Sequence, residues 1–234
     1  MNKNEFDQYI KNYRKNLNKT LSISGETSDF FAQYKAQKLY SWFPSLHNKN
    51  ISILDFGCGD GAMTSYVQKQ FVKAKIFGTD PSHLSIERAT KQYPKITFSQ
   101  LKENKIDYQT NTFDLVYAAG VFHHIDQQEH ECFYSQIMRV LRPGGRFVLF
   151  ELNPYNPLTQ ITFRRCPIDK NATMISTRSA KKLLSQAGET KTIYYCFFPA
   201  FLKKLRALEK YLTWLPLGAL YASIVKKEDP REKI

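Results

Sequence analysis

Short apolar runs, rich in β-branched and aromatic residues, alternate along most of the chain with stretches whose apolar residues recur at helical spacing. This alternation predicts parallel strands joined by crossover helices, because a strand that pairs in parallel must be reached by a long connection. The sequence therefore predicts an α/β fold with a doubly wound sheet covered on both faces. The expected strands are residues 51–56, 75–80, 96–100, 113–119, 146–152, 191–198 and 220–227.

The length of 234 residues suits one domain with added segments rather than two full domains. We expect an N-terminal helical extension over residues 1–45 and a main domain over residues 46–234. Two stretches, residues 153–176 and 199–217, are too long to be simple turns and are expected to be insertions. Both follow the carboxyl ends of strands, where open α/β sheets bind ligands, so we expect them and the extension to roof the site.

The chain is basic, with a formal net charge of +13, which permits nucleic acid, an anionic membrane surface or an acidic substrate as partner. The N-terminus is polar, without the apolar stretch of a secretory signal, and no run approaches the roughly 18 apolar residues of a spanning helix. A cytoplasmic location is therefore expected. The cysteines, Cys58, Cys132, Cys166 and Cys196, form no C-x-x-C pair and are interpreted as reduced thiols rather than zinc ligands.

Glycine and aspartate residues follow the first predicted strand in the stretch "ILDFGCGDG". Gly57, Gly59 and Gly61 let the backbone bend tightly and approach a ligand, but their spacing is not that of the G-x-G-x-x-G dinucleotide motif. Asp80 ends the second strand, where a carboxylate can bind the hydroxyls of an adenosine ribose. A helix cap is the alternative interpretation of both Asp60 and Asp80. The combination indicates a cofactor that contains adenosine.

Four segments carry a resemblance to a known family: "ILDFGCGDGAMT", "GTDPS", "FDLVYAAGVFHHI" and "LRPGGRFVLFE". In this order they resemble the class I S-adenosylmethionine-dependent methyltransferases, close to the group that includes quinone-biosynthesis enzymes. The resemblance covers about residues 51–152. It implies a Rossmann-like, seven-stranded sheet with an antiparallel last strand, and S-adenosylmethionine as cofactor.

The resemblance also implies which residues bind the cofactor. Asp55 would order the loop and the methionine part, the glycines would pass beneath it, and Asp80 would hold the ribose. The family often places an acid after the third strand to meet the adenine, whereas this chain has "FSQLKEN" there, so Gln100 or the backbone near Leu101 is expected instead. The full expected set is Asp55, Gly57, Cys58, Gly59, Asp80, Pro81, Gln100, Leu101, Ala118 and Ala119. Tyr34 or Lys35 of the extension is expected near the cofactor as well.

Methyl transfer from a sulfonium is an in-line displacement, for which the protein aligns the acceptor and removes a proton where one must leave. His123 and His124 follow the fourth strand, and we favour His124 as a general base, because related enzymes carry a histidine at the matching place. A structural role in fixing the loop is the alternative. His130 lies nearby, but no carboxylate stands at a matching spacing, so no metal site is expected.

The leading hypothesis is a methyltransferase that acts on a small-molecule or lipid-linked acceptor. An RNA methyltransferase fits the positive charge but lacks a recognisable RNA-binding module, so nucleic acid is the less favoured partner. A non-catalytic binding protein on the same fold stays open, whereas a dinucleotide-dependent oxidoreductase lacks its glycine motif. The "NPYNP" at residues 153–157 superficially resembles the N-P-P-Y signature of base-amine methyltransferases, but it follows the wrong strand and is expected to shape the insertion.

Residues 201–215 are predicted to form one amphipathic helix. Its lysines and arginine, Lys203, Lys204, Arg206 and Lys210, lie away from the apolar face. Two interpretations are open. In the first, the apolar face packs on the domain and closes the acceptor pocket. In the second, it contacts the anionic inner face of a membrane as a peripheral anchor. The apolar residues are Phe201, Leu202, Leu205, Leu208, Leu212 and Leu215.

Overall fold

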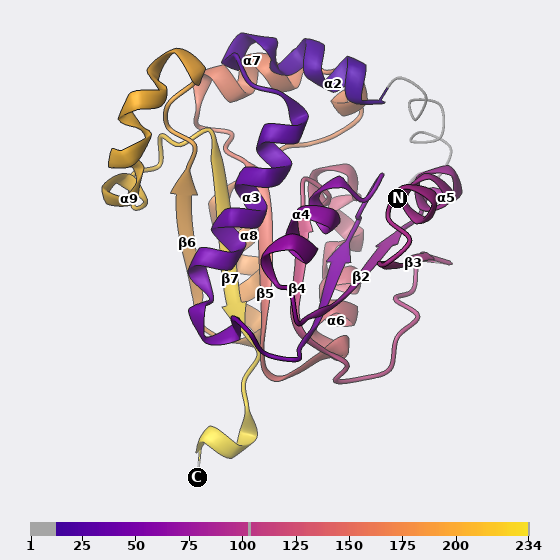
Figure 1. The fold of residues 1–234 in the computed structure, drawn as a ribbon. Helices are drawn as coiled ribbons and strands as arrows, with labels where there is room; N and C mark the ends of the chain where they lie inside the picture. Colours follow the sequence, from indigo (N-terminus) through magenta and orange to yellow (C-terminus); the bar gives the residue numbers. More distant parts are fainter. Residues whose placement is uncertain (1–12, 103, 234) are drawn as a thin grey trace.

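The computed structural model describes residues 13–102 and 104–233, which form a seven-stranded sheet in the order β3-β2-β1-β4-β5-β7-β6 (Figure 1). β7 runs antiparallel to both of its neighbours, β5 and β6, and the other pairs are parallel. The predicted fold class is confirmed, and each predicted strand overlaps an observed one. The strands are β1 (Ser52–Phe56), β2 (Lys75–Asp80), β3 (Thr97–Gln100), β4 (Phe113–Ala119), β5 (Leu141–Leu152), β6 (Thr190–Tyr195) and β7 (Leu220–Lys226).

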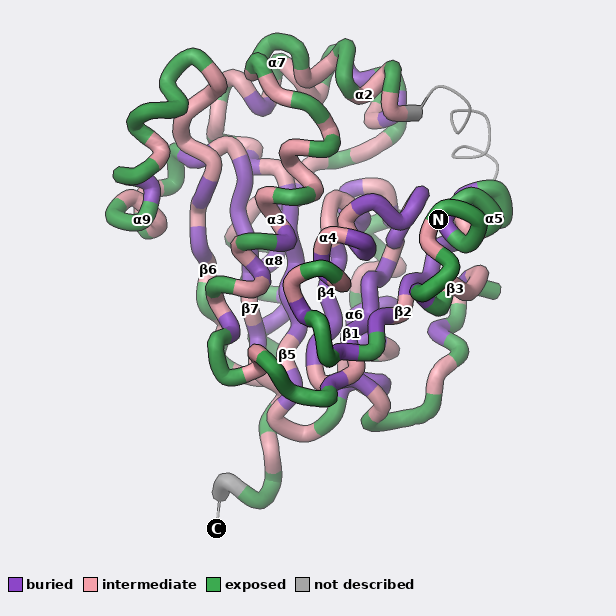
Figure 2. Tube along the Cα trace, in the orientation of Figure 1, coloured by how far each residue is buried: buried purple, intermediate pink, exposed green. Residues whose placement is uncertain are grey.

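Helices cover both faces of the sheet because alternate strand residues point to opposite sides. Leu54 of β1 belongs to the apolar cluster under α6 (His130–Val140) and α8 (Thr177–Leu184). Its neighbour Ile53 belongs to the cluster under α3 (Ser28–Trp42) and α4 (Ala62–Gln70). The central strands are buried almost throughout, as the purple trace in Figure 2 shows.

The remaining helical elements lie at the edges of this core. The α-helices are α2 (Tyr13–Leu21), α5 (His83–Gln92), α7 (Pro157–Arg165) and α9 (Glu209–Leu212). Short 3-10 turns occupy Ser22–Ser24, Pro44–Leu46, Phe122–His124, Gln127–Glu129, Pro167–Asp169, Ser185–Ala187, Ala200–Leu208 and Pro230–Lys233. No helix in the described ranges is both long enough and apolar enough to cross a bilayer.

Side-chain caps fix where several helices begin. Thr27 accepts a hydrogen bond from the Phe30 amide at the start of α3. Ser82, and not Asp80, caps α5. The "NPYNP" stretch begins α7, with Asn156 as the cap and Pro157 in the first helical position, where a missing N–H costs nothing. The motif therefore shapes the insertion, as its place in the sequence predicts.

Residues 201–215 do not form the single amphipathic helix that the sequence predicts. A 3-10 helix with a non-helical residue at Leu202 runs to Leu208, and one α-turn, α9, follows. The cause is Glu209, which is 2% exposed and accepts hydrogen bonds from the Phe197 and Phe198 amides at 2.9 and 3.3 Å. A buried carboxylate without hydrogen bonds is costly, so the hydrogen bonds of Glu209 determine the backbone here rather than the helical spacing of the apolar residues.

Candidate cofactor and acceptor site

A pocket of about 290 Å³ opens at the carboxyl edge of the sheet, beside the ends of β1 and β4. The strand order reverses between these two strands, which is where open α/β sheets bind ligands. The pocket lies beneath α2 and α7, which cross the top of the molecule in Figure 1. Residues of β7 and α3 complete its walls.

The glycine loop forms the floor of the pocket and has left-handed backbone at Gly57 (φ 77°) and Gly59 (φ 54°). A Cβ on Gly57 would lie 2.4 Å from Cγ2 of Val121, so this position admits no side chain. A Cβ on Gly59 would meet no atom within 4 Å. The open side of Gly59 is therefore where a ligand can approach the backbone.

Asp55 is held at the end of β1 by two side chains. Its Oδ2 accepts hydrogen bonds from Thr64 Oγ1 at 2.6 Å and from the Tyr117 hydroxyl at 2.8 Å. Burial raises the pKa of Asp55 to about 7, although the two hydrogen bonds act in the opposite direction. The carboxyl group lines the pocket and titrates near neutrality.

Asp80 ties the end of β2 to the glycine loop. Its Oδ2 accepts from the Gly59 amide and its Oδ1 from the Ser82 amide, each at 2.9 Å. The side chain lines the pocket between these two amides. The position that the resemblance assigns to ribose binding is thus also a structural support of the loop.

The structure brings most of the predicted cofactor residues to the pocket but not all of them. Asp55, Gly57, Cys58, Gly59, Asp80, Ala119 and His124 line it. Ala118 and Leu101 pack in the core, 0% and 2% exposed. Gln100 donates to the Pro81 carbonyl at 3.0 Å, and neither residue reaches the pocket wall. An adenine contact through these residues stays a prediction, while Ser85 and Arg88 of α5 line that end of the pocket.

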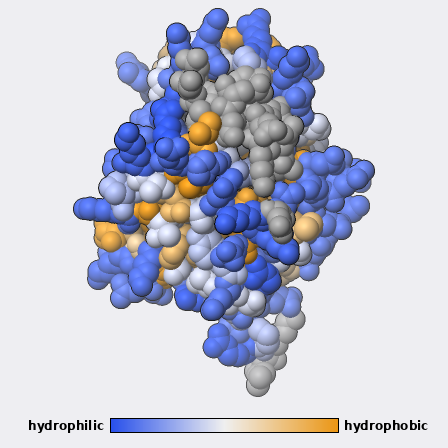
Figure 3. Space-filling view, turned by 90° about the vertical axis from the view of Figure 1, so that its right-hand side faces the viewer, coloured by the Kyte–Doolittle hydropathy of each residue, from blue (hydrophilic) through white to orange (hydrophobic). Residues whose placement is uncertain are grey.

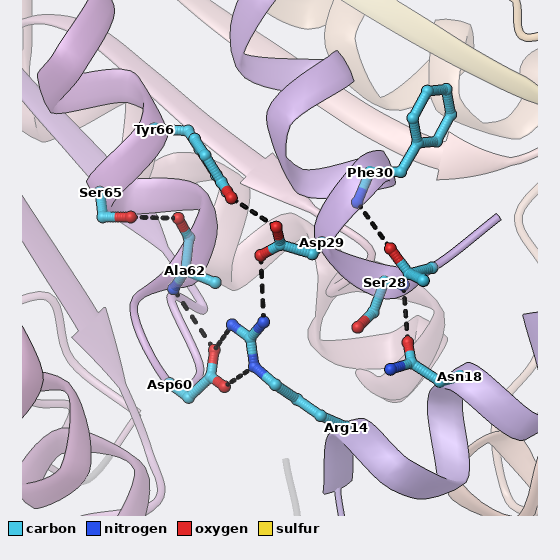
Figure 4. Close-up of polar contacts among 10 residues, drawn as sticks. Arg14, Asn18, Ser28, Asp29, Phe30, Asp60, Ala62, Ser65 and Tyr66 are labelled. Atoms are coloured by element: carbon cyan, nitrogen blue, oxygen red, sulfur yellow. Dashed lines mark hydrogen bonds and ion pairs between the residues drawn. The ribbon is translucent and has the colours of Figure 1, made fainter.

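Sequence reasoning missed the residues that α2 contributes, Arg14, Leu17 and Leu21. Arg14 reaches across to the glycine loop, where Nε and a terminal nitrogen bond the carboxylate of Asp60 (Figure 4). A second terminal nitrogen contacts Asp29 of α3 at 3.3 Å. The sequence predicted only that the N-terminal extension as a whole helps to roof the site. It gave no signal for Arg14 itself, because Asp60 lies 46 residues away.

Of the two extension residues expected near the cofactor, Lys35 lines the pocket. Burial lowers the pKa of its ammonium group. Tyr34 points elsewhere and donates a hydrogen bond to Glu209. The extension and α7 therefore roof the pocket, whereas no residue of 199–217 lines it. Residues 199–217 therefore do not line the pocket that they were predicted to help roof. Glu209 of this segment bonds Tyr34 of α3, and Arg206 bonds Glu26, just before α3.

Of the three histidines after β4, His123 and His124 share a carboxylate partner and His130 has other partners. His123 is buried, and its Nδ1 lies 2.6 Å from Oε2 of Glu151, the next-to-last residue of β5. Its Nε2 lies 3.6 Å from Oδ1 of Asp169, and Nε2 of His124 lies 3.3 Å from the same oxygen. His130 contacts the Phe122 and Ile125 carbonyls instead, which fixes the loop.

Two carboxylates therefore face the histidine pair, although the sequence showed none at a matching spacing. Burial alone would lower the pKa of His123, but Glu151 and Asp169 outweigh it and raise the pKa to about 10. Asp169 comes from the 3-10 turn after α7, and the chain folds back to place it there. His124 stands on the pocket wall, with Asp169 behind it.

Comparisons with known proteins agree with this geometry. Residues 53–145 match a family model described as a methyltransferase domain. A sterol 24-C-methyltransferase of Debaryomyces hansenii is 33% identical over 110 residues, which cover 44% of this chain and 28% of the relative. The ubiquinone/menaquinone biosynthesis C-methyltransferase UbiE of Desulfotalea psychrophila is 27% identical over 119 residues, 48% of each protein.

The crystal structure of a SAM dependent methyltransferase from Archaeoglobus fulgidus has the same fold, with a TM-score of 0.65 at 17% identity. The similarity covers 84% of this chain and 94% of that one. The matched region spans less than half the length of each of the two curated relatives named here. The predicted methyltransferase domain is confirmed for residues 53–145.

Proposed function

Because residues 53–145 form a class I S-adenosylmethionine-dependent methyltransferase domain, we propose that the chain methylates a lipid-like acceptor taken from an anionic membrane surface. The observation that carries this proposal is a pocket with apolar walls beside an exposed surface of apolar and cationic side chains. A location at the inner face of the cytoplasmic membrane is part of the proposal.

The pocket has two chemically different parts. Asp55, Gly59 and Asp80 supply polar groups at the glycine loop, where they suit the methionine and ribose of the cofactor. The remaining walls come largely from apolar side chains of the roof and of β5 and β7, namely Leu17, Leu21, Phe31, Leu152, Leu158 and Leu220. Such walls favour an acceptor with a hydrocarbon body, and Arg14, Lys35 and Arg88 add cationic groups to the lining.

The docking surface, as we name it, consists of Phe201, Leu205, Leu208, Tyr211, Trp214 and Leu217 together with Lys203, Lys204 and Lys210. Phe201 is 79% exposed and Trp214 is 72% exposed, and all three lysines are exposed. A set of large apolar side chains this exposed marks an interaction surface. Aromatic residues beside lysines are typical of segments that lie at an anionic lipid interface.

The segment that carries the docking surface has polar side chains facing the domain and apolar side chains facing solvent. Its inward contacts are polar, since Arg206 donates to Glu26 at 2.7 Å and Glu209 is enclosed by amides and the Tyr34 hydroxyl. Leu208, next to Glu209, is 49% exposed. Of the predicted apolar face, Phe201, Leu202, Leu205 and Leu208 are exposed, whereas Leu212 and Leu215 are partly buried. The exposed part supports the interpretation that a bilayer covers it.

The docking surface adjoins the roof of the pocket. The Asn156 side chain donates to the Leu217 carbonyl at 2.7 Å, and that of Asn153 donates to the Pro216 and Gly218 carbonyls. Thr159 of the pocket wall donates to the Ala219 carbonyl at 2.9 Å. An acceptor that leaves a membrane at this surface would meet the pocket directly behind it.

The names of the relatives favour a lipid over RNA, since they are described as sterol and quinone methyltransferases. The face beside α5 and β3, turned toward the viewer in Figure 3, is mainly hydrophilic outside the grey atoms, with apolar residues scattered over it. We therefore place the lipid contact at the docking surface and not on this face. For an acceptor that must lose a proton, His124 on the pocket wall is the candidate general base as long as no metal ion occupies its Nε2.

Methyl transfer tests the function directly. The protein is incubated with labelled S-adenosylmethionine and with vesicles that carry a polyprenyl quinone precursor, vesicles that carry a sterol, or total RNA. We expect label in a lipid fraction and a rate that increases with anionic lipid content. Label confined to RNA would overturn the choice of acceptor.

Vesicle sedimentation tests the docking surface separately. We expect the wild type to bind phosphatidylglycerol vesicles at low salt, and the double variant Leu205→Glu/Trp214→Glu to stay in the supernatant. Val72→Glu is the matched control, because Val72 is 68% exposed in the turn before β2, at the opposite edge of the sheet. Equal binding by all three proteins, or no binding by the wild type, would remove the membrane from the proposal.

A further inference from the structure

We propose that Nε2 of His123, Nε2 of His124 and Oδ1 of Asp169 form a binding site for a divalent first-row transition-metal ion. The three atoms lie within 4.8 Å of one another. They come from the loop after β4 and from the turn after α7, two segments separated by more than forty residues of sequence. The inference is independent of the proposed acceptor.

The separations between the atoms fit ligands that share one ion. Bonds of about 2.1 Å place neighbouring ligand atoms about 3.0 to 3.4 Å apart in octahedral or tetrahedral geometry. The oxygen of Asp169 lies 3.3 Å from His124 Nε2 and 3.6 Å from His123 Nε2. The two Nε2 atoms lie within 4.8 Å of each other, and the side chains would have to draw together around an ion to share it.

Glu151 supplies the second feature of a built metal site. Its Oε2 lies 2.6 Å from Nδ1 of His123, and its Oε1 accepts the Phe122 amide at 2.9 Å, so the buried carboxylate is fixed. A carboxylate in this position orients a ligand histidine and keeps the proton on Nδ1, which directs the lone pair of Nε2 toward the ion. Nothing in methyl transfer itself requires this second carboxylate.

The site also has an access route. His123 and His124 line a second, open hollow of about 760 Å³, together with Asp126, His130 and Asn171. On its other side His124 lines the cofactor pocket. An ion that enters from the hollow would therefore reside in the wall between solvent and the reaction site, with positions left open for water or an oxygen of the acceptor.

The donor set indicates the kind of ion. Two imidazole nitrogens and one carboxylate suit zinc, iron(II), cobalt or manganese, whereas magnesium and calcium prefer oxygen ligands only. The ion would hold the turn at Pro167–Asp169, and with it the roof segment, against the loop after β4. Because an ion on Nε2 occupies the lone pair that a base would use, this site and a general-base role for His124 exclude one another.

Metal uptake tests the inference without any activity assay. Metal-free wild-type protein is dialysed against micromolar zinc and its content is measured by mass spectrometry, with the cobalt(II) absorption spectrum as a second readout. We expect one equivalent for the wild type and a loss of affinity of at least tenfold for Asp169→Asn. Asp126→Asn is the matched control, because Asp126 lines the same hollow but lies outside the ligand group.

Two results would overturn the site: no saturable uptake by the wild type, or equal uptake by Asp169→Asn. Should Asp169→Asn fail to fold, His124→Gln serves in its place, since it leaves the buried His123–Glu151 pair intact. Binding of S-adenosylmethionine is measured on the same samples. A protein that binds the cofactor but no metal keeps the proposed function and returns His124 to the role of a base.

Discussion

Arg14 of α2 donates two hydrogen bonds to Asp60 of the glycine loop, from Nε to Oδ2 at 2.7 Å and from a terminal nitrogen to Oδ1 at 3.2 Å (Figure 4). The pair joins the roof of the pocket to its floor across a ligand-sized space. Besides any role in the loop or as a helix cap, Asp60 therefore attaches α2 to the glycine loop. Arg14 thus links α2 to the glycine loop, and Asn18 of the same helix accepts a hydrogen bond from the Ser28 amide at the start of α3.

The first prediction follows from this pair. Arg14→Ala is expected to weaken S-adenosylmethionine binding about 5- to 30-fold, the equivalent of about 1–2 kcal/mol for a charge-assisted contact that is partly exposed. The measurement is calorimetric titration. Arg142→Ala is the matched control, because it breaks an arginine–aspartate pair with Asp114 at 2.5 Å, remote from the pocket. A similar loss in both variants would argue against a closing contact.

The second prediction concerns the choice of cofactor. Asp80→Ala is expected to weaken S-adenosylmethionine binding by about 1–3 kcal/mol, since the Gly59 amide loses its acceptor and the ribose loses its carboxylate. The folded state should persist, as judged by circular dichroism. NAD titrated into the wild type is the control ligand, and tight NAD binding without a response to S-adenosylmethionine would contradict the assignment.

The third prediction concerns pH. The pKa of Asp55 in the folded protein, about 7, lies above the ordinary 3.8, so the folded chain keeps this proton over a range in which the unfolded chain has lost it. Asp55 therefore lowers the free energy of unfolding as pH rises from about 4 to about 7. Binding of the positively charged methionine end needs the carboxylate, so cofactor affinity is expected to rise between about pH 6 and 7.5.

Asp55→Asn provides the comparison for this pH dependence. The amide cannot ionise, so both the fall in stability and the rise in affinity should flatten across the same range. Affinity profiles are measured by titration in buffers of matched ionic strength. An unchanged slope in the variant would assign the pH dependence to another group.

The fourth prediction separates folding from ligand binding by means of two glycines. Gly57→Ala is expected to destabilise the protein by about 2–4 kcal/mol, because its left-handed backbone is strained and its Cβ would overlap Val121. Gly59→Ala carries only the backbone strain, about 1–2 kcal/mol, but places a methyl group in the cofactor space. Thermal unfolding and calorimetric titration of each variant give the comparison. Equal effects on stability would contradict it.

The strands and the glycine loop were predictable because their signals are local. A buried strand such as β4 is a largely apolar run of residues. The glycines before α4 stand where the backbone has positive φ, so their spacing predicts the bend. The position of Asp80 on the pocket wall has a similar origin, since the end of a parallel strand is also the edge at which ligands bind, while its contact with a ribose stays a prediction. The order of elements along the chain thus carries most of the fold.

The partners of the histidine pair were not predictable, because they meet only when distant segments fold together. Asp169 is 46 residues from His123, and Glu151 is 28 residues from it. The helix expected over residues 201–215 failed for a related reason. Apolar residues do recur there at helical spacing, but the segment is held by hydrogen bonds of buried Glu209, and one of these comes from Tyr34, 175 residues earlier in the chain.

The Asn153, Asn156 and Thr159 side chains each bond a carbonyl between Pro216 and Ala219, so the pocket wall and the docking surface share one set of anchors. A displacement at Leu217 must pass through Asn156 into the first turn of α7, which carries Thr159. Contact with a bilayer would then alter the shape of the pocket as well as the supply of acceptor. The kinetic signature is interfacial activation, in which turnover depends on the area of lipid surface rather than on the bulk concentration of the acceptor.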